Sequence, residues 1–369
     1  SFSVANLIKA VYGKNKKALI LDLDNTLWEG VIGDDGPEGI EIGEETSLGQ
    51  AYREFQSYIK MHKDIGILLA INSKNDLENA VSGLTHPDGL LRPEDFQVIK
   101  ANWNNKDANI REIAQELNLG ADSFVFVDDN IVERDIVKKG TQGVAVPEIV
   151  TVESYITTID KAGYFEIIEL SKEDIVRNQM YKVNVERKTA QKEFFDYTEY
   201  LLSLEMIADI KTFESIYVSR IAQLTNKTNQ FNLTTKRFSQ SEIELIMADD
   251  LTIKISGRLR DKFGDNGVTS LVIGTIEDTI MNIELWLMSC RVLKRNMEFA
   301  MMDALVEEAL EKGIKTIKGY YIKTAKNQMV KEFYGSMGFK LIGQEGENTI
   351  WQLELEAYQS LNKVIQVNV

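Results

Sequence analysis

The stretch KALILDLDNT at residues 17–26 decides the fold of the first half of the chain. Its apolar run KALILDL (17–23) is typical of a buried strand in a parallel sheet. Asp22 and Asp24 lie two positions apart, so their side chains point the same way in an extended backbone. A DxD triplet alone would be explained as exposed acids or helix caps at the end of a strand. Residues further along the chain favour a functional explanation.

Two later apolar runs also end in reactive side chains. ILLAI (67–71) precedes Ser73, and SFVFV (123–127) precedes Asp128 and Asp129. Helical patterns at 47–62, 75–84 and 109–117 separate these runs, which predicts a parallel sheet with crossover helices and a fourth short strand at 144–147. Ligands of such sheets bind at the carboxyl ends of the strands, so these polar residues are expected to meet there. The Gly-rich stretch 29–43 predicts a small β-hairpin flap.

The residue types in this group suit Mg²⁺-dependent phosphoryl transfer. Asp22 is the predicted nucleophile, since a carboxylate can attack phosphorus and form an acyl phosphate. Asp24 is the predicted acid/base, which protonates the leaving oxygen and then activates water. The predicted Mg²⁺ ligands are hard oxygens, and they are Asp22, Asp24, Asp128 and Asp129. Ser73 and Lys106 are the predicted phosphate-binding residues, with Lys100 as the competing lysine.

Bulk composition bounds the remaining possibilities. A chain of 369 residues is expected to form two domains. Its net charge of −15 argues against a nucleic acid as the main partner, and no window has the apolar length of a membrane span. The one cysteine excludes an intrachain disulfide and predicts a reducing, cytoplasmic setting.

The second half of the chain has a different pattern. Residues 151–202 are long, helical and charged, and we interpret them as a helical connector between a domain at 1–150 and another at 203–369. The last segment alternates strands such as LTIKIS (251–256) and TSLVIGTIE (269–277) with helices, the strongest at Met297–Lys312. Helices are also predicted at 215–224, 241–247 and 328–337. This order predicts a second α/β domain.

The ordered set DxDxT, Ser, Lys and DD resembles the motifs of the haloacid dehalogenase (HAD) superfamily. That resemblance adds Thr26 to the phosphate-binding set, as the small polar residue that fixes the loop. More specific motifs resemble FkbH-type proteins over roughly residues 17–340; they include LDLDNTLWEGVIGDDG, QLTNKTNQFNLTTKRF and SCRV. Members of that family are bifunctional glyceryl transferase/phosphatases. The resemblance implies a Rossmann-like HAD sheet with a minimal cap, followed by an acyltransferase domain of GNAT type.

The resemblance also implies a substrate and a partner. It points to removal of the phosphates of 1,3-bisphosphoglycerate and transfer of the glyceryl group to the phosphopantetheine thiol of an acyl carrier protein. Cys290 is the candidate thiol, because it ends a predicted strand and precedes a helix next to Arg291, where a thiolate is favoured. A lone cysteine is otherwise a small buried hydrophobe. Lys294 and Asn296 replace the glycines expected in this segment, which argues against acetyl-CoA bound in the usual way.

The polar run 226–235 has two explanations. It is either a capped loop held by bonds between side chains and backbone, or an acyl or carrier site, which is the function implied by the resemblance. Its candidate residues are Asn226, Thr228, Asn229, Gln230 and Asn232, with Arg291 nearby in the predicted site. The alternative function for the whole chain is a plain small-molecule phosphatase whose C-terminal domain only docks a partner.

Overall fold

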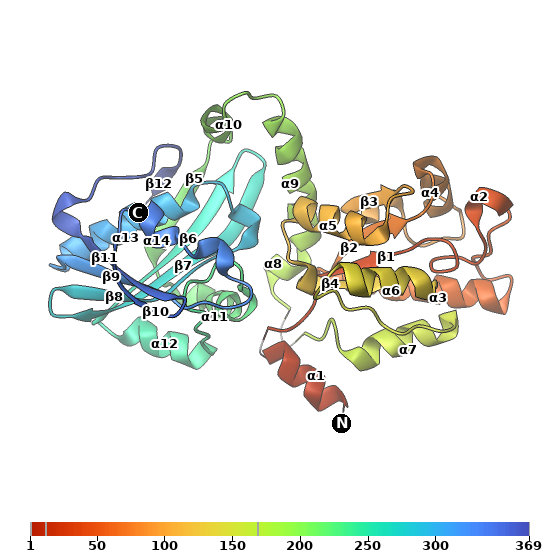
Figure 1. Cartoon of the computed structure of the whole chain (residues 1–369), viewed down its shortest axis with the longest axis horizontal. Coiled ribbons are helices and arrows are strands. Elements are labelled where there is room, and N and C mark those ends of the chain that lie inside the picture. The colour runs from red at the N-terminus through yellow and green to blue at the C-terminus, as the bar shows by residue number, and fades with distance from the viewer. Residues whose placement is uncertain (1, 12, 168–169, 369) are drawn as a thin grey trace. The chain divides into compact units, whose positions relative to one another are not determined.

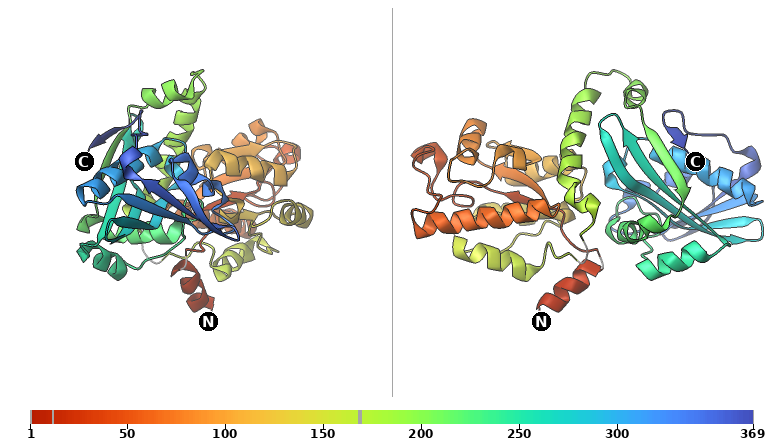
Figure 2. Two further views of the ribbon diagram at one scale, coloured as in Figure 1. Left: turned by 60° about the vertical axis from the view of Figure 1, so that its left-hand side comes forward. Right: turned by 180° about the vertical axis from the view of Figure 1, so that it is seen from behind.

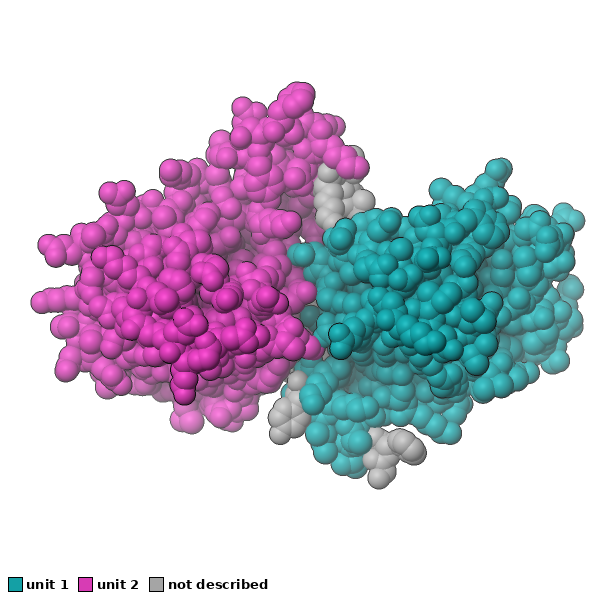
Figure 3. Space-filling view, in the orientation of Figure 1, with its two compact units in different colours: residues 1–182 teal, residues 183–369 magenta. Residues whose placement is uncertain are grey.

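A computed structural model describes residues 2–11, 13–167 and 170–368 of the chain (Figure 1). The chain divides into two compact units, Ser1–Lys182 and Val183–Val369, which are coloured separately in Figure 3. The boundary falls inside helix α9 (Arg177–Gln191), within the predicted connector 151–202. Each unit contains its own sheet, so the predicted α/β class with a second α/β unit is confirmed.

Unit 1 is built on a four-stranded parallel sheet in the order β3-β2-β1-β4. All residues of β1, β2 and β4 are buried, as expected for a sheet covered on both faces. In register, Leu21 of β1 lies beside Ile71 of β2 and Val127 of β4, so these strands end together. The strands are β1 (Ala18–Leu21), β2 (Leu68–Ser73), β3 (Val98–Ala101) and β4 (Phe124–Val127).

Helices cover both faces of this sheet. The long helix α3 begins after Thr46, whose hydroxyl accepts a 2.9 Å hydrogen bond from the Gly49 amide. Phe55 and Ile59 of α3 share one hydrophobic core with Leu19 and Leu69 of the sheet. The helices of unit 1 are α1 (Phe2–Val11), α2 (Ile32–Asp35), α3 (Ser47–Asp64), α4 (Leu77–Leu84), α5 (Lys106–Leu117), α6 (Ile131–Gly140), α7 (Val152–Ala162) and α8 (Lys172–Ile175).

Two sequence expectations for unit 1 were wrong in detail. The fourth strand is β3 and not residues 144–147, where Ala145 makes only an isolated bridge to Val125. The sequence VIKA of β3 is short and only partly buried, so it lacks the apolar run that marks the other strands. The flap at 29–43 is closed by an antiparallel bridge between Glu29 and Glu41, but it contains the short helix α2 where a β-hairpin was predicted.

Unit 2 contains an eight-stranded mixed sheet, seen from behind in Figure 2, in the order β10-β11-β9-β8-β7-β6-β5-β12. Pairing is antiparallel except for β8 with β9 and β12 with β5. The strands are β5 (Ile207–Thr212), β6 (Thr252–Asp261), β7 (Gly264–Glu277), β8 (Ile280–Met288), β9 (Thr316–Tyr321), β10 (Lys340–Glu345), β11 (Asn348–Glu354) and β12 (Gln366–Asn368).

The helices of unit 2 belong to two hydrophobic cores. Met297 and Met301 of α13 share a core with Ile255 of β6. Ile221 of α11 and Ile243 of α12 share the other core with Leu271 and Leu285 of the sheet. The predicted helix 328–337 is instead a 3-10 turn at Gln328–Val330 followed by one short helix. The helices are α10 (Tyr197–Ser203), α11 (Val218–Lys227), α12 (Gln240–Ala248), α13 (Met297–Glu311) and α14 (Phe333–Ser336).

In the described part of the chain, no helix has both the length and the apolar content needed to cross a bilayer.

Candidate active site

Three carboxylates meet at the carboxyl end of the unit 1 sheet. Asp22 directly follows β1, and its amide donates to the Val127 carbonyl oxygen at 3.0 Å, so the strand pairing carries on to this residue. Asp128 and Asp129 follow β4. Oxygens of Asp22, Asp128 and Asp129 lie within 4.8 Å of one another. The structure therefore brings together three of the four predicted metal ligands.

This group fits a divalent cation. Asp22 and Asp128 are 7% and 0% exposed, so their charges repel each other in a region that water screens poorly. Burial raises the pKa of Asp128, and repulsion from Asp22 raises it further. The same two causes raise the pKa of Asp129. Oδ1 of Asp22 is buried and has no hydrogen-bond partner among the described residues, as expected of an oxygen that binds a metal.

Lys106 is the lysine of this site. It is the first residue of α5 and only 2% exposed, and its Nζ lies 2.8 Å from Oδ2 of Asp22 and 2.6 Å from Oδ2 of Asp128. Burial lowers the pKa of Lys106, but attraction to the two carboxylates outweighs it and raises the pKa overall. The competing Lys100 instead pairs with Glu112 and Glu116 of α5, at 2.7 Å each.

Asp24 has a separate environment. Its Oδ1 accepts hydrogen bonds from Nε1 of Trp28 at 3.0 Å and from the Ile32 amide at 3.1 Å, and its Oδ2 accepts one from Nδ2 of Asn75 at 2.9 Å. Its carboxylate is outside the three-carboxylate group, so the geometry does not support Asp24 as a side-chain metal ligand. Burial raises the pKa of Asp24 despite these bonds, which favours the protonated form that a general acid needs.

Thr26 and Ser73 lie at the same edge of the sheet. The Thr26 hydroxyl is fully buried and accepts a 3.2 Å hydrogen bond from the amide of Asp129. Thr26 therefore fixes the position of Asp129, which agrees with its expected role in holding the loop. Ser73 is the last residue of β2 and is 2% exposed.

Sequence reasoning missed two residues that position the acids. Asn75 donates a hydrogen bond to Asp24. It lies two residues after Ser73 in the polar motif NSKND, and that position could have indicated a role at the site. Arg134 is 5% exposed and donates to the carbonyl oxygens of Asp128 and Asp129 at 2.7 Å each. It anchors the DD pair from the first turns of α6. Arg134 lies in the stretch that resembles FkbH-type proteins, but no role was predicted for it.

In unit 2, Cys290 begins a 3-10 turn, Cys290–Val292, two residues after β8 ends at Met288. Cys290 is half-buried as a residue, and α13 begins seven residues later at Met297. Arg295, five residues after Cys290, is 7% exposed and binds Oδ2 of Asp261 at 3.1 Å. Arg187 binds the other oxygen of Asp261 at 2.7 Å. Arg295 is therefore engaged in a buried ion-pair network.

Lys294 and Asn296 keep a glycine-like backbone. Their φ angles are 66° and 61°, in the left-handed region that glycine adopts without cost. The glycines expected at these positions would fit the backbone without strain. The backbone is therefore the one that glycines would adopt, but it carries the side chains of Lys294 and Asn296.

The polar run 226–235 is held mainly by its own hydrogen bonds. Nδ2 of Asn226 donates to the Ala222 and Phe238 carbonyl oxygens at 2.9 and 3.0 Å. Asn232 is fully buried and accepts a 2.8 Å bond from the Thr235 amide, while Oδ1 of Asn229 accepts one from Arg237 at 2.6 Å. These bonds are those of a capped loop. Thr228 directly follows α11, and Gln230 and Arg291 are partly exposed.

Part of this run lies along the outer edge of β8. Strands β8 and β9 pair only from Ile280 to Asn282, and β8 continues six residues further without β9. There the Leu233 amide donates to the Trp286 carbonyl oxygen, and the Met288 amide donates to the Phe231 carbonyl oxygen, both at 3.0 Å. The Thr234 hydroxyl donates to the Glu284 carbonyl oxygen at 2.7 Å. Segment 231–234 therefore occupies the edge that the divergence of β9 leaves open.

Comparison with family models and with curated proteins finds no match to this chain. Among solved structures, the chain is similar to the N-terminal part of the protein BF1531 from Bacteroides fragilis, which contains a phosphatase domain and is complexed with Mg. That match has 43% identity and a TM-score of 0.44, and it covers 45% of this chain and 45% of that one. The similarity thus spans less than half the length of either chain.

Two N-acetyltransferases also match. The ribosomal-protein-S18-alanine N-acetyltransferase from Escherichia coli has 12% identity and a TM-score of 0.32, with 42% of this chain and 100% of that chain covered. The PaiA N-acetyltransferase from Thermoplasma acidophilum, in complex with coenzyme A, has 13% identity and a TM-score of 0.30, with 40% and 98% covered. An acyl-transfer role for unit 2 stays a proposal.

Proposed function

We propose that unit 1 is a Mg²⁺-dependent phosphatase in which Asp22 is the nucleophile. The observation that carries this proposal is the group formed by Asp22, Asp128 and Asp129, with a buried Asp22 oxygen that lacks a partner among the described residues. These three carboxylates would hold the ion, which when bound neutralises the carboxylates and the phosphate oxygens.

The chain's own residues then account for both half-reactions. A carboxylate oxygen of Asp22 attacks phosphorus, and the bond from phosphorus to the leaving oxygen breaks. Protonated Asp24 gives its proton to that oxygen. Asp24 then takes a proton from water as the water attacks the aspartyl phosphate, which releases inorganic phosphate and restores Asp22. Lys106 and Ser73 stabilise the charge on the transferring group.

Acetyl phosphate hydrolysis by the full chain tests this proposal. Activity should require Mg²⁺, should disappear with a chelator, and should fall by at least about a thousandfold in Asp22→Asn. The exposed Asp88→Asn is the matched control and should keep full activity. Rapid quenching should find a phosphoryl group on the peptide that contains Asp22. An active Asp22→Asn enzyme would refute the mechanism.

For the whole chain we propose coupled acyl transfer, which rests on the resemblance to FkbH-type proteins. The donor would be a small acyl phosphate, with 1,3-bisphosphoglycerate as the first candidate, and the acceptor a carrier-protein thiol. Cys290 would attack the acyl carbon, release phosphate and hold the acyl group as a thioester before exchange with the carrier thiol. Its half-buried position at the end of β8 supports access by a substrate.

The alternative is a phosphatase whose unit 2 does not transfer an acyl group. Segment 231–234 favours this alternative. It already binds the backbone groups on the outer edge of β8, near Cys290, so they are not open to an acyl or pantetheine chain. Incubation with 1,3-bisphosphoglycerate, Mg²⁺ and a holo carrier protein, followed by mass spectrometry, separates the two. Acyl transfer predicts a glyceryl mass on the carrier that is lost in Cys290→Ser, while the alternative predicts phosphate release without any added mass.

A further inference from the structure

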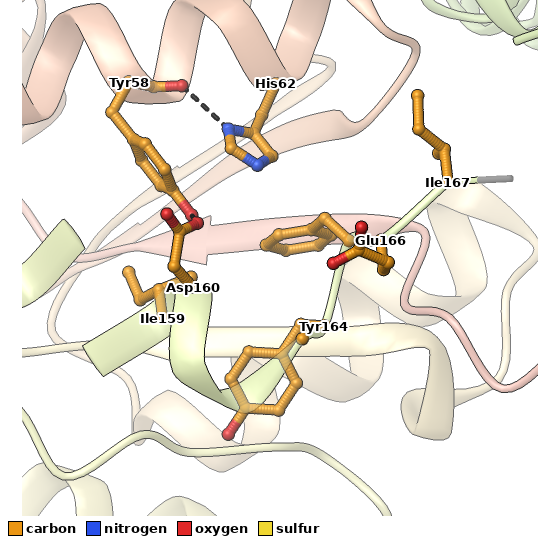
Figure 4. Close-up of a pocket in the computed structure, with 9 residues that line it drawn as sticks. Tyr58, His62, Ile159, Asp160, Tyr164, Glu166 and Ile167 are labelled. Carbon is orange, nitrogen blue, oxygen red and sulfur yellow. Dashed lines mark hydrogen bonds between the residues drawn. The ribbon is translucent and has the colours of Figure 1, made fainter. Parts of the chain in front are cut away.

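Unit 1 contains a cavity of about 190 Å³ apart from the carboxylate site. It lies between the last turns of α3 and the segment 163–167 that follows α7 (Figure 4). Side chains that carry its chemistry are Tyr58, His62, Asp160, Phe165 and Glu166.

This cavity is at the opposite end of the sheet from Asp22. The Tyr164 carbonyl oxygen accepts a 2.8 Å hydrogen bond from the Lys16 amide, two residues before β1 begins. The His62 carbonyl oxygen accepts a 3.0 Å bond from the Ile67 amide, one residue before β2 begins. The cavity therefore adjoins the amino ends of β1 and β2, whereas Asp22 follows the carboxyl end of β1. The proposed phosphatase reaction uses none of its residues.

The polar groups of the cavity are hydrogen-bond acceptors. Nδ1 of His62 lies 2.9 Å from the Tyr58 carbonyl oxygen, which can only accept, so Nδ1 carries the proton. Nε2 of the neutral ring is then an acceptor, and Figure 4 shows this edge of the ring turned toward the space between Asp160 and Glu166. Burial lowers the pKa of His62 and so favours the neutral ring.

Two carboxylates complete this set. The Tyr58 hydroxyl donates to Oδ1 of Asp160 at 2.7 Å, so the tyrosine proton is used. The second Asp160 oxygen has no hydrogen-bond partner among the described residues and is open to a ligand. Within the described residues, the Glu166 carboxylate has no ion pair, and no lysine or arginine lines the cavity. An anion would meet two negative charges here, so the site selects against phosphate and carboxylate ligands.

Aromatic rings form the rest of the wall. The ring centroids of Tyr58 and His62 are 4.2 Å apart, and the His62 and Phe165 rings meet at 5.3 Å with an edge-to-face angle of 62°. Ring faces attract cations and also accept methylene groups. Acceptors and ring faces around one small cavity suit a ligand with a positive donor head and a short apolar chain.

We propose that this cavity binds the head of a primary alkylammonium. The three N–H donors of the ammonium would meet Asp160, Glu166 and Nε2 of His62, and its methylene groups would lie against Phe165. A free amine and a lysine side chain share this chemistry. The volume fits the head group and a few carbons, so a bulky quaternary ammonium is expected to bind worse.

Isothermal titration calorimetry on the full chain tests the proposal with n-butylamine as the probe and n-butanol as its neutral counterpart. Butylamine should bind at least tenfold more tightly than butanol. Glu166→Gln and Asp160→Asn should each weaken butylamine binding at least about tenfold, because each removes a negative charge that accepts a hydrogen bond from the ammonium. The Asp160→Asn variant should fold, because the new amide oxygen still accepts the bond from Tyr58. Glu54→Gln, an exposed acid of the same helix α3, is the matched control and should bind like the parent.

Three outcomes would overturn the proposal: no butylamine binding, equal binding of butanol, or an unchanged dissociation constant in both cavity variants. Phosphatase activity is measured in parallel, and the two carboxylate variants should keep it. If butylamine binds as expected, an N-acetyl-lysine amide with a free ε-amine distinguishes the source. Its tighter binding would indicate a lysine side chain as the natural ligand, and its exclusion would indicate a free amine.

Discussion

Replacement of Lys106 by methionine isolates the electrostatics of the carboxylate site. Lys106 is 2% exposed and lies within 2.8 Å of Asp22 and Asp128, so its removal leaves two buried carboxylates without a cation. The loss of one partner from a buried ion pair destabilises a protein by about 3–5 kcal/mol. For a unit of this size the lower value corresponds to a fall of about 6–12 °C in melting temperature.

The loss should depend on pH and on Mg²⁺. Lys106 lowers the pKa of Asp128, so without it that pKa rises further above its value in the unfolded chain. The protonated form of Asp128 therefore preserves stability at low pH, and stability is lost as pH rises through the folded pKa. Destabilisation should be larger at about pH 8.5 than at about pH 5.5. Mg²⁺ should restore more stability to the variant than it adds to the parent, since it supplies the missing positive charge.

Differential scanning calorimetry with and without MgCl₂ measures both effects. Lys100→Met is the matched control, because Lys100 makes two salt bridges to half-exposed glutamates and should contribute less than about 1 kcal/mol. The reasoning is refuted if Lys106→Met costs no more than Lys100→Met, or if Mg²⁺ raises the melting temperature of parent and variant equally.

Three further predictions concern single side chains. Lys294→Gly should raise the free energy of unfolding by about 0.5–1 kcal/mol, and Asn296→Gly by less, because asparagine tolerates a positive φ better; urea titration measures both. Asn327→Ala should cost about 2–3 kcal/mol in the same assay, since the fully buried Asn327 amide donates to the carbonyl oxygens of Asn232 and Ile322 at 2.9 Å each. His62 has a lowered pKa in the folded state, so its contribution is lost as pH falls below about 6.5, and His62→Gln should flatten the stability profile between about pH 7 and pH 5.

The carboxylate site was predictable because its residues follow apolar strands. The runs before Asp22, Ser73 and Asp128 are continuous and buried, and parallel pairing fixes where they end. Lys106 was the predicted lysine and Lys100 its competitor, and the difference between them depends on which lysine begins α5 beside the carboxylates. The separation of Asp24 from the metal group also depends on local bonds, here with Trp28 and Asn75.

Unit 2 was predictable only in outline. Its strands are marked by apolar alternation. Nothing in the sequence indicates, however, that β8 and β9 pair only as far as Asn282. Nothing in the polar run 226–235 indicates that Phe231 and Leu233 bind the backbone of β8. The short strand β3 in unit 1 was missed for a similar reason, because a partly buried edge strand needs little apolar sequence.

The buried ion-pair network around Asp261 determines where the chain can be shortened. Arg187 in α9 and Arg295 before α13 bind the two oxygens of a carboxylate that is 0% exposed. A fragment that starts at residue 203, the predicted beginning of the second domain, would lack Arg187 and leave Asp261 with one cation instead of two. A fragment that starts near residue 177 keeps the whole of α9. The second should be recovered from expression as folded protein, and the first should misfold or aggregate.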